Sequence, residues 1–377
     1  MGTVWHARRS LALSCLLGFL ATLSFVVSTL PTLPLYVRER GASAPEVGLA
    51  MAVVPLVAAC TPLAGLDGPL LGGRRVLLPA AALLAVVPFA YPYAPDVWSV
   101  LALRLAHAVG LVLLPTFAPV TGTEALAGWQ RRAPSALGAV GAWLLGPLLA
   151  GQTIARAGTG VAFLLAGLAG ALALALLAVL PAAWPRLEQA DWALASGRAT
   201  AAEAALRLAC GPIEAFLPLY ALLVGVSIAQ TGLLFALCLA WSIGAAPFVA
   251  YLERRGEGTA RAAGLPLAAL GVAGLALGSD YRSELLGMVC LGLGIGLVCG
   301  SLAARLPEGD SGRRGGLRSA LPSLAQAAGS LAAGLAIPGF GEPAIFFAAA
   351  IVLAGTAILL AAVEAGIGSR QVGRLQG

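Results

Sequence analysis

The sequence predicts an all-α integral membrane protein whose twelve transmembrane helices form two pseudo-symmetric bundles of six. Of its 377 residues, 59% are hydrophobic and 11% are charged, whereas soluble domains carry roughly 25% charged residues. The mean hydropathy is +0.92, and apolar runs follow one another along nearly the whole chain. An internal repeat divides these runs into two equal sets.

The predicted spans follow from the thickness of a bilayer core, about 30 Å, which a helix crosses with about 20 apolar residues. They lie near residues 11–36, 46–66, 75–94, 97–121, 134–155, 160–182, 202–223, 228–251, 262–279, 284–305, 319–338 and 343–365. Abundant Gly, Ala and Leu favour closely packed helices over the alternating segments of a membrane barrel. The first run is too long for a cleaved signal peptide and lacks a small-residue cleavage site, so we interpret it as an uncleaved helix.

The repeat is clearest in two segments whose positions differ by 184 residues. "LPLYVRERGASAPEVGL" (33–49) and "LPLYALLVGVSIAQTGL" (217–233) share the LPLY start, one Gly, one Ser and the final Gly-Leu. The same offset pairs Gly72 with Gly256, Gly110 with Gly294, and residues 135–137 with 319–321. Six helices were therefore duplicated, and an even number leaves both copies in the same orientation. We expect bundles at 1–183 and 202–377, joined by a cytoplasmic linker at 184–201.

The basic residues indicate the orientation, and all 23 are arginines. With both termini in the cytoplasm, the inner segments carry eighteen of them, which satisfies the positive-inside rule. The net charge of +6 then reflects topology and anionic headgroups rather than nucleic acid. We expect a monomer in the cytoplasmic membrane.

The sequence contains no motif for ATP-driven transport or for enzyme catalysis. There is no Walker-type glycine loop, no H-E-x-x-H and no nucleophile elbow. The six cysteines have no paired spacing, and we interpret them as small packing residues rather than as metal ligands. We therefore expect no enzyme activity, no cofactor and no metal.

Two loops carry a resemblance to a known family. "GLDGPLLGGRR" (65–75) is similar to the G-x-L-x-D-R-x-G-R-R loop of the major facilitator superfamily, with Gly65, Gly72 and Arg74 in place and Pro69 where the family has Asp. The second copy, "YLERRGEG" (251–258), fits better. The resemblance implies a cytoplasmic charge latch that includes Glu253 and Arg254, with Asp67 as a substitute acid in the first copy.

Helices 4 and 5 extend this resemblance, which covers residues 10–366. "LALRLAHAVG" (101–110) resembles the family's R-x-x-Q-G signature, with Arg104 kept and His107 at the Gln position. Glu124 and Arg131 match its E-x6-R element. "GAVGAWLLGPLLAG" (138–151) resembles the G-P signature of the drug/proton antiporter branch, which implies conformational roles for Gly146, Pro147 and Gly151.

Three ionisable residues inside spans are candidates for proton coupling. An Arg near a helix centre costs roughly 2.5–3.5 kcal/mol to insert, so Arg104 is expected to face a cavity or a partner rather than to extend to the outer interface. His107 shares its face at i+3 and either handles protons or is a neutral interior imidazole. Glu214 lies close to the midplane, where loss of water favours the uncharged carboxyl that a proton carrier needs; the alternative is a structural partner. At its repeat-related position stands Leu30.

The remaining acids near spans, Asp67, Glu124, Glu203, Glu253 and Glu364, fall at cytoplasmic ends, and we interpret them as latch or capping residues. Four polar residues on spans could orient a substrate or could equally be interface anchors or helix-helix hydrogen-bond partners: Tyr36, Tyr220, Gln152 and Gln326. With few fixed charges, the cavity favours an amphipathic or weakly charged molecule.

These features together predict a secondary transporter that exports a small molecule by proton antiport and alternating access, with the lipid bilayer as its environment. An uptake symporter or uniporter on the same scaffold is one alternative. A membrane scaffold or assembly protein that retains the fold is the other, and the degenerate first loop motivates it.

Overall fold

The computed structural model describes residues 2–63, 74–114, 134–179, 197–256, 258–303 and 313–375. The predicted gating residues Gly65, Asp67, Gly72, Glu124 and Arg131 lie outside these ranges, as does most of the predicted linker. At Arg74 the backbone alone is described.

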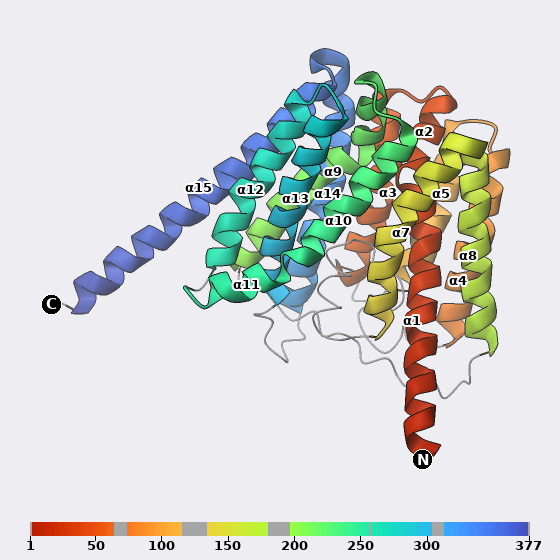
Figure 1. Ribbon diagram of the computed structural model, residues 1–377, viewed down its shortest axis with the longest axis horizontal. Helices are drawn as coiled ribbons and strands as arrows, with labels where there is room; N and C mark the ends of the chain where they lie inside the picture. The colour runs from red at the N-terminus through yellow and green to blue at the C-terminus, as the bar shows by residue number, and fades with distance from the viewer. Residues whose placement is uncertain are drawn as a thin grey trace.

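Every element in the described ranges is helical (Figure 1). In chain order they are α1 (Gly2–Thr29), α2 (Thr32–Glu39), α3 (Ala44–Leu63), α4 (Arg74–Ala90), the 3-10 turn η1 (Tyr91–Tyr93), α5 (Val97–Val112), α7 (Pro134–Ala157), α8 (Thr159–Val179), α9 (Gly197–Leu223), α10 (Ile228–Gly244), α11 (Ala246–Glu253), α12 (Thr259–Leu277), α13 (Tyr281–Ala303), α14 (Arg313–Phe340) and α15 (Glu342–Leu375).

These helices confirm the predicted helical membrane fold. Eleven spans in the described residues are long and apolar enough to cross a bilayer, and α5 is a shorter apolar helix in the place of the fourth predicted span. Two spans consist of paired helices, because α1 continues into α2 and α10 into α11. In addition, α9 begins at Gly197 rather than near 202, so it includes part of the predicted linker.

The repeated segment forms the same turn in both halves. Gly41 follows α2 with φ +82°, and its counterpart Gly225 follows α9 with φ +81°. Glycine reaches this left-handed region without the steric cost that a Cβ brings. The next helix then starts in the same way in each copy: Ser43 donates to Glu46 at 2.7 Å, and Ser227 and Gln230 form a capping box. The two copies thus agree in backbone conformation as well as in sequence.

A second pair of matching helix starts was not anticipated. Asp96 accepts from the Ser99 N–H at 2.7 Å at the start of α5, and Asp280 accepts from the Ser283 N–H at 3.0 Å at the start of α13. Both residue pairs are 184 positions apart. These backbone hydrogen bonds hold the pKa of the Asp96 and Asp280 carboxyls below their usual range, because each bond favours the ionised form.

The two halves meet along two seams, which α3 forms with α14 and α7 forms with α10. A Cβ on Gly48 of α3 would lie 2.5 Å from the Ser330 carbonyl oxygen of α14. A Cβ on Gly232 of α10, the counterpart of Gly48, would overlap the Pro147 carbonyl oxygen of α7. Small residues permit this close backbone approach. Both seams lie toward the end of the molecule opposite the termini, and the halves diverge toward the termini (Figure 1).

Candidate functional site

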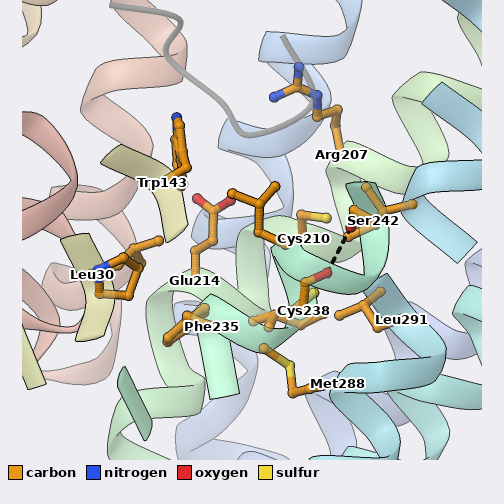
Figure 2. Close-up of a pocket in the computed structure, with 14 residues that line it drawn as sticks. Leu30, Trp143, Arg207, Cys210, Glu214, Phe235, Cys238, Ser242, Met288 and Leu291 are labelled. Carbon is orange, nitrogen blue, oxygen red and sulfur yellow. Dashed lines mark hydrogen bonds between the residues drawn. The ribbon is translucent and has the colours of Figure 1, made fainter. Parts of the chain in front are cut away.

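A cavity lies between the two halves, with an empty volume of about 660 Å³ that includes the open space at its mouth. Its walls are mostly apolar, and α7, α9, α10 and α13 contribute most of them (Figure 2). The lining residues are Leu30, Trp143, Pro147, Arg207, Cys210, Ile213, Glu214, Phe235, Cys238, Leu239, Ser242, Met288, Leu291 and Ile295. A mostly apolar lining with a few polar side chains is typical of sites that bind small organic ligands.

Glu214 is the acidic residue of this lining, and it belongs to a chain of polar contacts. The Gln326 amide Nε2 of α14 donates to Glu214 Oε2 at 2.8 Å. Arg207 Nη1, two turns before Glu214 on α9, donates to Gln326 Oε1 at 3.3 Å. Arg207 also forms an ion pair with Glu203 at 3.7 Å. Gln326 therefore separates the carboxylate from the guanidinium while contacting both.

Arg104 of α5 is buried in the first half, with 1% of its surface exposed. Its Nη1 donates to the Thr29 hydroxyl at 3.1 Å, and its guanidinium lies 5.6 Å from the centre of the Phe25 ring. Among the described residues no carboxylate forms an ion pair with it. A buried guanidinium without a paired anion is costly to maintain, which is typical of a functional charge.

His107 lies beside Arg104 and is fully buried. The Phe25 ring meets it edge-on at 6.5 Å, and the Tyr91 ring lies 6.1 Å away. Neither ring nitrogen has a hydrogen-bond partner in the described residues. The position thus combines an apolar surround with a neighbouring positive charge, both of which favour a neutral imidazole.

Glu214 and Arg104 carry opposite charges and belong to different halves; the larger electrostatic influence on Glu214 comes from Arg207 of its own helix, and Arg104 adds a smaller one. The first half supplies the positive group and the second half supplies the negative one. A change in the charge of either residue therefore alters the attraction between the halves at the level of the cavity.

The other predicted substrate residues lie apart from the cavity lining. Tyr36 donates its hydroxyl to the Tyr91 carbonyl oxygen, and Tyr220 donates to the Gly278 carbonyl oxygen at 2.9 Å. Gln152 is half-buried on α7. Of the four residues predicted to orient a substrate, the structure brings Gln326 into contact with the cavity through Glu214.

The predicted conformational residues of α7 lie where that helix contacts other helices. A Cβ on Gly146 would lie 2.7 Å from Val26 of α1, and a Cβ on Gly151 would lie 2.8 Å from the Ile228 carbonyl oxygen of α10. Pro147 lines the cavity, and its carbonyl oxygen lies close to the backbone of Gly232. The G-P segment thus reaches both the seam and the cavity wall.

The residues that the sequence predicts as a latch in the second half lie at the α11–α12 turn. Glu253 accepts from the backbone N–H groups of Gly258 and Ala260, both at 3.2 Å, and from the Ser301 hydroxyl at 2.9 Å. Arg254 caps α11 and is exposed. Glu253 thereby ties the start of α12 to the end of α13.

Several site residues are missed by the sequence analysis. Arg207 belongs to the inner arginines that indicate topology, but it is 5% exposed and lines the cavity. Cys210 and Cys238, interpreted as packing residues, line it as well. Cys210 and Arg207 precede Glu214 by four and seven residues, which places all three on one face of the helix. This spacing could have indicated that they share the cavity with Glu214. In the described residues no group of three or more His, Cys, Asp or Glu is placed to hold a metal ion.

A helical membrane protein with two halves and a cavity between them has an architecture found in membrane transporters. The sequence matches the Major Facilitator Superfamily over residues 14–306, so the chain belongs to this family of membrane transporters. It is a transporter and not an enzyme. No curated protein matches the sequence significantly.

Solved structures of transporters share the fold along nearly the full chain. The nucleoside transporter NupG is 13% identical, with 93% of this chain and 98% of that one covered and a TM-score of 0.69. The human organic anion transporter MFSD10 (TETRAN) is 18% identical, with coverages of 94% and 99% and a TM-score of 0.64. A POT family transporter in complex with a thioalcohol-conjugated peptide is 12% identical, with coverages of 95% and 96% and a TM-score of 0.73.

Proposed function

We propose that this chain exports an amphipathic or weakly charged small molecule across the cytoplasmic membrane in exchange for protons, and that Glu214 carries the proton. The observation that carries the proposal is the placement of Glu214 in the wall of the cavity, bonded to a neutral amide. A carboxyl held by an amide can bind and release a proton more readily than one locked to a guanidinium, whose charge stabilises the ionised form.

The polar chain provides a way to sense that proton. Gln326 donates to Glu214 and accepts from Arg207, an arrangement that suits the carboxylate. A proton on Glu214 Oε2 replaces the acceptor with a donor, and the amide then loses a partner. Protonation also removes the attraction between Glu214 and Arg104 across the halves. Proton binding would therefore loosen the contact between the bundles and favour the rocking motion of alternating access.

The direction of transport rests on the G-P segment and on orientation. The α7 segment with Gly146, Pro147 and Gly151 is similar to that of exporting antiporters and packs at the seam. If both termini are cytoplasmic, the halves are closed at the outer end and the cavity loads from inside. Moving one charge through about 100 mV supplies about 2.3 kcal/mol, which supports roughly a fiftyfold concentration ratio.

The test uses everted membrane vesicles that contain the full chain, with a pH-sensitive dye to report proton movement. Ligands are first chosen from a panel of drugs and metabolites by their effect on the melting temperature of the purified protein. We expect a stabilising ligand to dissipate the pH gradient, and Glu214→Gln to abolish this response. Glu46→Gln is the matched control, because the second half already carries Gln230 at the equivalent position.

Three results would contradict the proposal. Proton movement that survives in Glu214→Gln removes the proposed carrier. Cellular accumulation of the ligand that rises with expression indicates an uptake symporter or uniporter. A normal cellular phenotype of the Arg104→Ala, Glu214→Ala double variant indicates a non-transporting scaffold or assembly protein.

A further inference from the structure

Glu284 is a second buried acid that the sequence analysis did not single out. It lies in the first turn of α13, where its surface is 0% exposed. Neither carboxylate oxygen has a hydrogen-bond partner in the described residues. A buried charge without hydrogen bonds is strongly penalised, so this position favours a carboxyl that binds a proton.

The position of Glu284 on α13 connects it with the cavity. Met288, Leu291 and Ile295 line the cavity at spacings of three and four residues, which places them on one helix face. Glu284 continues this face by one more turn, about 6 Å beyond Met288 at 1.5 Å per residue. That turn lies on the side of the cavity where the two halves are closed (Figure 1). Opening of this end would extend the cavity to Glu284.

In the part of the chain that the structure describes, no arginine forms an ion pair with Glu284. Tyr220 of α9 interacts with it electrostatically, and so does Asp280, which directly precedes α13. Glu342 of α15 acts on Tyr220. Arg282 lies at the exposed start of α13 and interacts with Asp280. In the described residues α10 and α12 present no ionisable side chain at this level, and the charged residues of α11 lie at the opposite end of α13. The start of a helix favours an anion, but the Asp280 carboxylate opposes a second negative charge there.

The first half offers the matching control position. The residue 184 positions earlier is Val100, which is buried on α5. An apolar side chain therefore satisfies the same place in the duplicated scaffold, and the acid is not required by the fold.

We propose that Glu284 is a second proton-binding site, which exchanges its proton with the outer solution when the outer end of the transporter opens. In this inference, which rests on the proposed function of Glu214, the two acids form an inner and an outer station on the path of the coupled protons. Tyr220 lies six residues after Glu214, about 9 Å farther along α9. It interacts with Glu284 and so lies between the two acids along the axis of the molecule.

The test is infrared spectroscopy of the full-length protein in lipid vesicles between pH 5 and pH 9, in the carbonyl-stretching region of protonated carboxyls. We expect the wild type to show two components that disappear as the pH rises. Glu284→Gln should remove one component and Glu214→Gln the other. If Glu284→Gln does not fold, Glu284→Val takes its place, since Val100 shows that the scaffold accepts this residue.

Two outcomes would overturn the inference. A spectrum of the Glu284 variant that equals the wild-type spectrum at every pH means that Glu284 is ionised throughout. A component that the variant lacks but that persists at all pH values in the wild type means that Glu284 is permanently neutral. The Glu214→Gln response in everted vesicles is a separate measurement, so failure of the proposed function is distinguishable from failure of this inference.

Discussion

The two halves of the chain share a scaffold but differ in their buried charges. Both use a left-handed glycine before the next helix and an aspartate cap on a later one, at Gly41 and Gly225 and at Asp96 and Asp280. In the interior, the first half has Arg104 and His107 where the second has Met288 and Leu291. The second half instead has Glu214 and Glu284 where the first has Leu30 and Val100. Residues that both copies keep hold the fold, and residues that differ are the candidates for transport chemistry.

The largest expected effect comes from removing the buried charge of the first half at Arg104. Arg104→Met places in the first half the residue that the second half has at the equivalent position. We expect ligand-driven proton movement to fall to background, because the first half then no longer presents a positive charge that attracts Glu214 across the halves. The melting temperature should not fall, because the buried guanidinium has no ion-pair partner in the described residues and Met removes the free-energy cost of holding that charge away from water.

Met51→Leu serves as the control for this variant, because it conserves volume at a buried site that does not line the cavity. This control should change neither the ligand-driven proton movement nor the melting temperature. Full proton movement in Arg104→Met would contradict the view that residues differing between the halves carry transport chemistry, since the buried charge of the first half would then have no part in transport.

The next effect concerns the seams, which the halves share. Gly232→Val introduces atoms where a Cβ alone overlaps the Pro147 carbonyl oxygen, and overpacking of this kind costs about 1–3 kcal/mol. We expect backbone hydrogen exchange at the start of α10 and the end of α7 to accelerate about fivefold or more. Gly48→Val should do the same to α3 and α14.

Gly244→Val is the control on the same helix, because none of the described atoms lies within 4 Å of a Cβ there. Acceleration in one seam variant and none in the other would show that the two halves are not held together in equivalent ways.

The repeated turns provide a smaller and more symmetrical test. Gly41→Ala and Gly225→Ala meet no steric obstacle from neighbouring residues, so their cost is the left-handed conformation itself, about 1–2 kcal/mol each. Thermal unfolding should show equal losses for both variants. Unequal losses would show that one copy of the turn has become less constrained than the other.

The smallest effect involves the caps of α5 and α13. Because the Asp96 and Asp280 carboxyls have lowered pKa values in the fold, they contribute stability that is complete above the unfolded value of about 3.9 and is lost as the pH falls through the lower folded value. The melting temperature of the wild type should therefore drop slightly below about pH 4. The Asp96→Asn, Asp280→Asn double variant should show a shallower drop, and an unchanged drop would assign acid sensitivity to other groups.

Much of the scaffold was predictable from the sequence, because membrane spans follow from apolar length and the duplication follows from one constant offset. The paired helices α1–α2 and α10–α11 and the early start of α9 were not predicted in detail, since hydropathy records length and not backbone breaks. For the site, the buried position of Arg104 and the cavity position of Glu214 were anticipated from their cost in a membrane.

The rest of the site depends on contacts between distant segments. Gln326 reaches Glu214 from a helix 112 residues away, and no local pattern specifies that pairing. Arg207 was interpreted as one of the arginines that indicate the cytoplasmic side, and this interpretation gave no reason to expect it in the cavity lining. Glu284 stands at the beginning of a predicted span, where an acid is ordinarily assigned to the interface, and three-dimensional packing against α9 and α12 is what buries it.

The close approaches of Gly48 and Gly232 to backbone carbonyl oxygens have a consequence for how opening can be controlled. Contacts between main-chain atoms contain no titratable group, so these two close approaches respond neither to pH nor to screening by salt. Any dependence of opening on acidity must then originate in side chains such as Glu214, and its size is bounded by the charge that those side chains gain or lose. The proposed proton sensor is thus the side chain of Glu214 on α9, whereas the close contacts between the halves are main-chain contacts of other helices, so one can be altered by mutation while the other is left intact.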